Sequence, residues 1–219
     1  MSKPISEVMC EDCMEMMSRY PDKYFDLAIV DPPYGIDYLH SGGLGTNCKN
    51  KKHNRKWHER KDWDTAIPNS IYWTELCRIS KNQIVFGANY FTEFLPPSMG
   101  WVFWDKGQDL SMSDGELAYT SFNKALRRVK INRGQLTVEG GTIHPTQKPI
   151  ALYVWLLKNY AKSGDKILDT HLGSGSSRIA AYKLGFDFWG CEIDADYFKA
   201  SCERFDREAY TVSTANDYF

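Results

Sequence analysis

The fold is decided by residues 166–178, which read KILDTHLGSGSSR. A short apolar run reaches Asp169, a turn of small residues follows, and a segment with helical spacing begins at Ser176. Glycines at 173 and 175 allow a ligand to approach the backbone of this turn. About 20 residues further on, the next apolar run ends at Glu192, where an acid can accept from ribose hydroxyls. The stretch therefore predicts a strand, a ligand-binding turn and a helix in a parallel α/β sheet.

The same alternation of apolar runs and helical spacing extends along the whole chain. It predicts strands at 6–10, 25–30, 83–87, 100–104, 117–122, 166–169 and 186–193, and helices at 13–19, 70–78, 90–95, 150–161, 176–184 and 195–208. Asp194 is the expected N-cap of the last helix. We predict an α/β fold with a doubly wound, mostly parallel sheet of the seven-stranded type and helices on both faces.

Length and composition limit the class of protein. The 219 residues favour one domain, 1–219, and 42% hydrophobic with 25% charged residues excludes disordered, collagenous and disulfide-scaffold chains. No apolar run approaches the roughly 20 residues needed to cross a bilayer, and the first residues lack a signal-peptide core. We therefore expect a cytoplasmic protein with no membrane partner.

Six cysteines are scattered along the chain, and free thiols are expected. Cys10 and Cys13 form one CxxC, but a zinc site would need further ligands from Cys48, His53 and His58. Scattered small hydrophobic residues explain these positions more simply, so we expect no metal.

The net charge of −1 conceals two basic stretches. Residues 49–62 and 124–133 each carry a net charge of +5, which leaves −11 on the rest of the chain. Such segregation indicates contact with phosphates, although a solvated charged face is the alternative. The segment 37–64, which holds the first stretch, also interrupts the α/β alternation. A loop of this length is typical of a functional lid.

A second motif, Asp31-Pro32-Pro33-Tyr34, follows the predicted strand 25–30 directly. The prolines fix the backbone and remove two N–H donors, so the Asp31 carboxylate and the Pro32 carbonyl become a rigid pair of acceptors. Tyr34 adds a flat face. This set suits a planar group that bears an amine, such as a nucleobase.

A third motif, residues 144–149 (HPTQKP), offers hydroxyl, amide and ammonium donors that could hold a carboxylate. It could equally be a helix start with proline at its first position. The turn at 169–177 lacks the third glycine of a dinucleotide fingerprint and has no GK[ST]. An adenosine ligand without pyrophosphate therefore fits this turn better than a dinucleotide.

Together these motifs resemble the amino-group DNA methyltransferases, which use S-adenosylmethionine to modify adenine N6 or cytosine N4. The order, with the catalytic motif before the cofactor motif, is similar to their β arrangement. The resemblance implies a Rossmann-like methyltransferase fold, S-adenosylhomocysteine as product, and double-stranded DNA as partner with the target base flipped out. It also implies a bacterial, phage or mobile-element protein of the restriction-modification type.

The resemblance assigns site residues by position. The implied catalytic residues, which hold and stack the target base, are Asp31, Pro32, Pro33 and Tyr34. The implied cofactor-binding residues are Asp12, Asp31, His144, Thr146, Lys148, Asp169, His171, Gly173, Gly175, Ser176 and Glu192. The basic stretches supply the expected DNA-binding residues Lys49, Lys51, Lys52, Arg55, Lys56, Lys124, Arg127, Arg128, Lys130 and Arg133. Two positions depart from the family, because His171 replaces the usual Phe and Glu11 the usual Gly.

Several alternatives stay open at this point. The Asp-Pro-Pro-Tyr form looks more like adenine than cytosine methylases, but either base offers an amine to the same acceptors. RNA or a protein amide could be the acceptor, and a module that only binds is a further alternative. A dinucleotide oxidoreductase would leave 31–34 without a role. The segment 123–143, where target recognition falls in the family, is short. Either the recognised DNA sequence is short, or the lid also contributes to recognition, or a second subunit of a homodimer does so.

Overall fold

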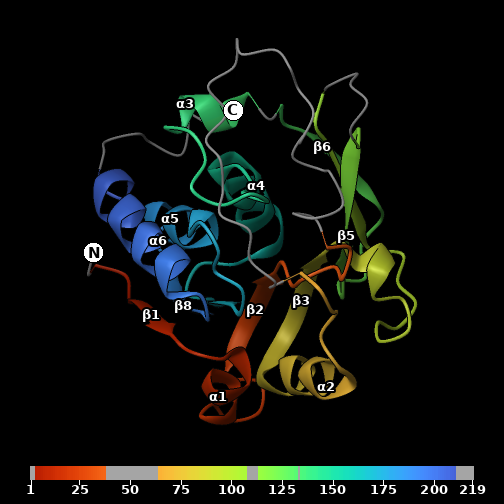
Figure 1. Ribbon diagram of the computed structural model, residues 1–219. Coiled ribbons are helices and arrows are strands. Elements are labelled where there is room, and N and C mark those ends of the chain that lie inside the picture. Colours follow the sequence, from red (N-terminus) through yellow and green to blue (C-terminus); the bar gives the residue numbers. More distant parts are fainter. Residues whose placement is uncertain (1–2, 38–63, 108–112, 133, 211–219) are drawn as a thin grey trace.

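The computed structural model describes residues 3–37, 64–107, 113–132 and 134–210, which form one twisted sheet with helices on both faces (Figure 1). Its eight strands are β1 (Ser6–Cys10), β2 (Phe25–Val30), β3 (Ser80–Phe86), β4 (Trp101–Asp105), β5 (Gly115–Thr120), β6 (Arg127–Lys130), β7 (Lys166–Asp169) and β8 (Asp187–Glu192). Their order is β1-β8-β7-β2-β3-β5-β4-β6. All pairs are parallel except those of β5, which runs antiparallel to β3 and β4. The predicted doubly wound, mostly parallel sheet is thus confirmed.

The helices cover the sheet in two layers. On one side lie α1 (Cys13–Ser18) and α2 (Ser70–Ile79), and on the other α4 (Ile150–Tyr160), α5 (Ser176–Lys183) and α6 (Ala195–Glu208) (Figure 1). Strand β2 shows why both faces are needed: Leu27 and Ile29 pack in the core that contains α4 and α5, whereas Ala28 and Val30 pack in the core that contains α1 and α2. A strand that is buried on both faces has a continuous run of apolar residues in its sequence.

Two local predictions were wrong. Residues 90–95 were expected to be a helix, but only the 3₁₀ turn η1 (Ala88–Tyr90) forms, and the chain then bends before Pro96 and Pro97. Strand β6 lies within the basic stretch 124–133, which was not expected to contain a strand. The short helix α3 (Gln135–Val138) follows it.

The topology brings the two main motifs together. Strands β7 and β2 are neighbours, yet the chain continues from β7 to β8 on one side and from β2 to β3 on the other. Asp31 follows β2 and the turn at 170–175 follows β7, so both lie at the carboxyl ends of adjacent strands. Ligands of open α/β sheets bind at such a switch point. No helix in the described ranges has the length and apolar character to cross a membrane.

Candidate active site

The turn after β2 is held rigidly by a residue that the sequence did not single out. The Asp64 carboxylate accepts hydrogen bonds from the backbone N–H groups of Tyr34 (2.7 Å) and Gly35 (3.0 Å), and Asp64 is buried. Gly35 has a positive φ of 67°, which glycine adopts without strain. Behind the turn, a Cβ at Gly87 would lie 2.2 Å from the Tyr34 ring, so only glycine leaves room for it.

Tyr34 is packed as an aromatic side chain and bonded as a polar one. Its ring stacks on Tyr90 with centroids 5.1 Å apart and an interplanar angle of 16°, and Phe91 meets its edge. Its hydroxyl donates to Oδ1 of Asp31 at 2.6 Å. The turn therefore presents a carboxylate beside an aromatic pair.

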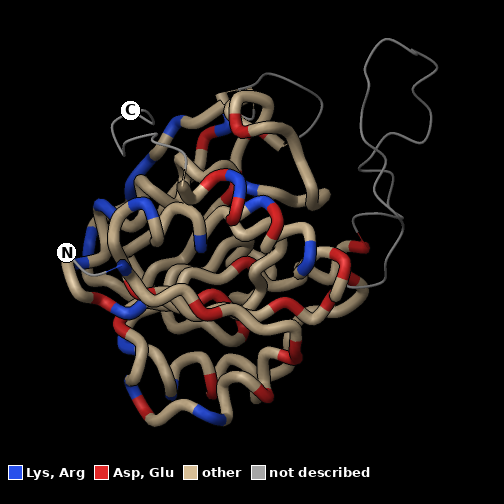
Figure 2. Tube along the Cα trace, turned by 90° about the vertical axis from the view of Figure 1, so that its left-hand side faces the viewer, with Lys and Arg blue, Asp and Glu red and all other residues tan. Residues whose placement is uncertain are grey.

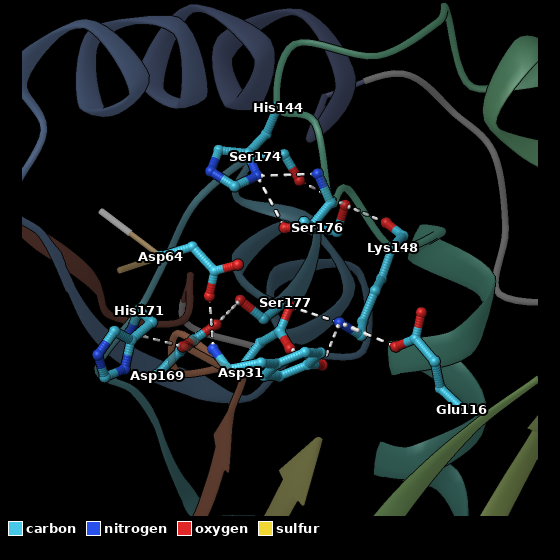
Figure 3. A network of polar contacts seen from close by, with 12 residues as sticks. Asp31, Asp64, Glu116, His144, Lys148, Asp169, His171, Ser174, Ser176 and Ser177 are labelled. Atoms are coloured by element: carbon cyan, nitrogen blue, oxygen red, sulfur yellow. Dashed lines mark hydrogen bonds and ion pairs between the residues drawn. The ribbon is translucent and has the colours of Figure 1, made fainter. Parts of the chain in front are cut away.

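Asp31 is one member of a chain of four charges, of which Figure 3 shows Asp31, Lys148 and Glu116. The Lys148 ammonium donates to Oδ2 of Asp31 and lies 3.3 Å from Oε2 of Glu116. Oε1 of Glu116 in turn pairs with the Lys106 ammonium at 2.8 Å. Lys148 and Lys106 are both buried, so the two cations are withdrawn from water and depend on these carboxylates.

The pKa values reflect this competition between burial and charge. Burial raises the pKa of Asp31, which the Lys148 ammonium opposes and the Glu116 charge reinforces. Burial alone would raise the pKa of Glu116, but Lys148 and Lys106 outweigh it and lower that pKa to about 2. Burial alone would lower the pKa of Lys148, but the two carboxylates raise it above its usual value. Glu116 and Lys148 are therefore ionised at neutral pH.

A cavity of about 330 Å³ lies against the turn at residues 31–34. Eight of the predicted cofactor-binding residues line it: Asp12, Asp31, His144, Thr146, Lys148, His171, Gly173 and Glu192. Residues that the motifs did not indicate also contribute to its wall, among them Tyr153 and Tyr197. Asp31 and Pro33 belong to the wall too, so the cavity and the turn at residues 31–34 form one site.

The other three predicted cofactor residues, Asp169, Gly175 and Ser176, build the turn from behind. Asp169 accepts from the backbone N–H of His171 (3.0 Å) and from the Ser177 hydroxyl (2.5 Å). Gly175 has a φ of 73° and precedes α5. Ser176 donates to the Lys148 carbonyl at 2.7 Å, which ties this turn to the 144–149 segment.

Two of the acids that line the cavity also accept hydrogen bonds from backbone N–H groups. Glu192 accepts from the N–H groups of Gly173 (2.8 Å) and Asp194 (3.0 Å), and Asp12 caps α1 by accepting from Met14 at 2.7 Å. Each carboxylate oxygen has two lone pairs, so both side chains retain capacity for a ligand hydroxyl or amine. Burial raises the pKa of Glu192.

On the third motif, the imidazole Nδ1 of His144 accepts the backbone N–H of Thr146 at 3.3 Å and contacts its hydroxyl at 3.1 Å. The His144 ring packs edge-on against Tyr197, at 4.3 Å between centroids. Residues 144–146 therefore form a compact turn, and His144 and Thr146 line the cavity together with Asp31.

The predicted DNA-binding residues are only partly described. Lys49, Lys51, Lys52, Arg55, Lys56 and Arg133 lie outside the described residues. Arg128 pairs with Asp105 through two nitrogens, at 2.5 and 3.0 Å, and Lys124 donates to the Asn159 carbonyl. Arg127 and Lys130 are exposed on β6. Basic and acidic positions are interspersed along the described trace (Figure 2).

The metal prediction can be compared with the described part alone. There, no group of three or more His, Cys, Asp or Glu side chains is placed to hold an ion. Cys48, His53 and His58 lie outside it.

Comparison with known proteins agrees with these motifs. The family model N6_N4_Mtase, described as DNA methylase, matches residues 42–203. The chain is 25% identical over 249 residues to the type II methyltransferase M.HpaI of Haemophilus parainfluenzae, covering 92% of this chain and 74% of that protein.

Two solved structures share the fold. The M1.HpyAVI–SAM complex superposes with a TM-score of 0.60 at 16% identity, covering 91% of this chain and 98% of that one. The cytosine-N4-specific PvuII DNA methyltransferase gives 0.59 at 11% identity, covering 98% and 91%. The family match spans most of the sequence and includes the motifs from His144 to Glu192, with the Asp31–Tyr34 motif preceding it, and the chain belongs to this family of N6- and N4-directed DNA methylases.

Proposed function

We propose that this protein transfers a methyl group from S-adenosylmethionine to N6 of an adenine flipped out of double-stranded DNA. One observation carries the proposal: Asp31, at the end of β2, lies in the wall of the same cavity as Glu192, His144 and Thr146. An acceptor for an amine and a set of groups for an adenosine ligand thus meet at one point.

The donors and acceptors of the cavity fit this cofactor. Glu192 and Asp12 offer carboxylates for ribose hydroxyls and an adenine amine, and Thr146 offers a hydroxyl for a carboxylate. At Gly173, which has a φ of 51°, the three atoms nearest the position of a Cβ belong to the His144 ring and lie 3.8 Å away, so a ligand can approach its backbone. S-adenosylmethionine, when bound, supplies a sulfonium methyl group and leaves as a neutral thioether.

The chain's own residues activate and orient the amine. The lone pair of adenine N6 is delocalised into the ring, and acceptors that draw its hydrogens favour a pyramidal, more nucleophilic nitrogen. Asp31 and the Pro32 carbonyl supply those acceptors, and Asp31 offsets the positive charge that develops on nitrogen. Holding the amine in line at about 3 to 3.5 Å can contribute on the order of 7 to 11 kcal/mol. The amine proton leaves after transfer.

Adenine rather than cytosine is favoured by the Asp-Pro-Pro-Tyr form of the motif. The fold does not distinguish the two bases, since the chain also resembles the cytosine-N4-specific PvuII enzyme. Extraction of the base costs a few kcal/mol, which stacking on Tyr34 offsets by about 1 to 3 kcal/mol. The exposed basic residues are proposed to contact the phosphates on either side of the target.

Transfer of a labelled methyl group to unmethylated genomic DNA, with nucleoside digestion and mass identification, tests the proposal. N6-methyladenine is the expected product. N4-methylcytosine would retain the mechanism and reverse the base. No product on DNA, with the cofactor bound, would direct the search to RNA or to a protein amide.

Substitution of Asp31 tests its assigned role. Asp31→Ala is expected to lower the rate of methyl transfer by about 10² to 10³-fold, because the amine loses its charged acceptor. Binding of S-adenosylmethionine, measured by calorimetry, should change little, since most of the cavity wall is untouched. Full activity in the variant would contradict the assignment.

A further inference from the structure

The two oxygens of the Asp31 carboxylate have different partners. Oδ1 accepts from the Tyr34 hydroxyl of the same turn, and Oδ2 accepts from the Lys148 ammonium, which comes from the segment before α4. Lys148 is 3% exposed and is held from two sides, so its contact is a fixed part of the site. A target amine must therefore reach Asp31 at Oδ1, where it would replace the Tyr34 hydroxyl.

Lys148 is held in this position by a residue from the other half of the sheet. Glu116 lies on β5, directly opposite Trp104 of β4, and its Oε2 is 3.3 Å from the Lys148 ammonium. Lys106, which follows β4, binds Oε1 of the same carboxylate. The antiparallel β4–β5 pair thus fixes the position of Glu116, and Glu116 fixes that of Lys148.

We infer that Glu116 is a positioning residue for methyl transfer, which holds the Lys148 ammonium on Oδ2 of Asp31 and so leaves Oδ1 to accept from the target amine. This inference rests on the proposed function. It assigns Lys148 to the activation of the amine rather than to the cofactor carboxylate that the family resemblance implied.

The charges explain why a second carboxylate is useful here. A nitrogen that gains a methyl group becomes cationic until its proton leaves, and an ammonium beside Asp31 would weaken the stabilisation of that charge. Glu116 lies against the same ammonium, so the chain of Asp31, Lys148, Glu116 and Lys106 is neutral, whereas without Glu116 it would carry +1. Without Glu116, Lys148 would be held by Asp31 alone and could bridge both of its oxygens.

The inference predicts the direction of a pH effect. The ionisable groups that face Asp31 and Glu116 are Lys148 before α4, Lys106 after β4, Tyr34 in the turn, Tyr153 on α4 and Asp169 at the end of β7. The charge of Glu116 raises the pKa of both Asp31 and Lys148. Its removal should therefore move both limbs of a pH–rate profile to lower pH.

The test compares Glu116→Gln with Glu203→Gln, which removes the same charge from an exposed position on α6. The kcat of Glu116→Gln is expected to fall by about tenfold or more, the scale on which a misplaced catalytic group acts. The KM values for S-adenosylmethionine and DNA should stay close to those of the wild type. The acid limb should move to lower pH, whereas Glu203→Gln should match the wild type throughout.

A second variant should shift the acid limb of the pH–rate profile in the opposite direction. Lys106→Met removes a positive charge from the same chain of four, so its acid limb should move to higher pH. Suppose that both variants lose activity and melt at a lower temperature, while the limbs of their pH–rate profiles do not move. Glu116 would then have only a structural role, and the inference would be overturned.

A measurement without turnover separates this inference from the proposed function. The Asp31 carboxyl carbon can be followed by ¹³C NMR in aspartate-labelled protein, assigned with Asp31→Asn. The titration midpoint of Asp31 should be lower in Glu116→Gln than in the wild type, whether or not the wild type methylates DNA. A wild type that methylates no DNA would contradict the proposed function but not this inference. An unchanged midpoint would overturn the inference whatever the activity of the wild type.

Discussion

His171 lies in the turn after β7, at the position where the family resemblance implies Phe, and its surroundings keep the imidazole uncharged. The ring meets Tyr72 edge-on with centroids 5.4 Å apart, and its Nδ1 lies 3.0 Å from the Thr170 hydroxyl. That hydroxyl contacts the Tyr72 hydroxyl at 2.8 Å. Burial lowers the pKa of His171 to about 4. At neutral pH the residue therefore acts as a neutral aromatic ring, as Phe would.

This environment predicts how stability depends on pH. The pKa of His171 is about 4 in the folded chain, below its ordinary value of 6.5, so the neutral form is favoured by folding. The contribution of this lowered pKa to the free energy of unfolding is complete above pH 6.5 and is lost as the pH falls toward 4. Between pH 7.5 and 5 the free energy of unfolding should fall by about 2 kcal/mol on this account.

The variant His171→Phe removes the titration while keeping the ring. Urea unfolding of both proteins at pH 7.5 and 5 should show that the variant loses about 2 kcal/mol less than the wild type over this interval. The hydrogen bond lost to Thr170 affects both pH values alike, so the difference isolates the imidazole. Equal losses in the two proteins would show that His171 is protonated as easily in the fold as outside it.

The residues of the site divide into those with a sequence signal and those without one. Asp31 and Tyr34 follow the apolar strand β2 and Glu192 ends β8, each within a short motif, and such placement is visible along the sequence. Glu116 and Lys106 have no motif and join Asp31 only because β5 lies between β3 and β4. One weak signal existed: Glu116 is the single charged residue of an otherwise uncharged strand. Long-range pairing of charges cannot be read from spacing alone.

At the scale of elements, the buried strands and amphipathic helices could be predicted, and the sheet edge could not. Strand β2 is apolar almost throughout, and α6 begins at Asp194, whose carboxylate accepts from Asp196 and Tyr197 as expected of an N-cap. Strand β6 has the sequence RRVK, in which only Val129 is buried. Its pairing with β4 supplies the backbone hydrogen bonds. Its sequence shows neither the alternation of apolar and polar residues nor the hydrophobicity that would predict a strand.

Helix α4 has an unusual cap that ties three elements together. Pro149 provides no side-chain cap, and Glu139, after α3, accepts the N–H groups of Ile150 (2.9 Å) and Ala151 (3.4 Å) instead. The Glu139 carboxylate also lies 3.6 Å from the guanidinium of Arg204 on α6, and both side chains are buried. Arg204 in turn donates to Ser174, in the turn after β7, and to Ser176, at the start of α5.

Glu139→Ala is expected to destabilise the fold by about 1 to 2 kcal/mol, because it removes the cap of α4, while Arg204 keeps the Glu208 carboxylate at 3.1 Å. Urea unfolding measures this change. The double variant with Arg204→Ala should lose less than the sum of the single variants, since they share one interaction. The exposed Glu203→Ala serves as control and should remain within about 0.5 kcal/mol. Strict additivity would show that the two side chains are not coupled.

At the scale of the whole molecule, the charge distribution limits how DNA can be bound. A chain of net charge −1 has no overall attraction for a polyanion, so affinity must come from local basic residues. In the described part of the second basic stretch, Arg128 is paired with Asp105, and the ammonium of Lys124 binds a carbonyl. Arg127 and Lys130 are exposed on the edge strand β6 and are the better candidates for phosphate contact.

The salt dependence of DNA binding distinguishes these residues. Each phosphate contact contributes roughly 0.9 to the slope of log K against log salt concentration. The double variant Arg127→Gln, Lys130→Gln should therefore flatten that slope by up to about 2, measured by fluorescence anisotropy with a duplex. Arg128→Gln should change it less, since its charge is already offset by Asp105. Lys162→Gln with Lys199→Gln removes two exposed charges elsewhere as a control. If the control flattens the slope as much as the β6 variant, binding responds to total charge and the edge strand is not the DNA-contacting surface.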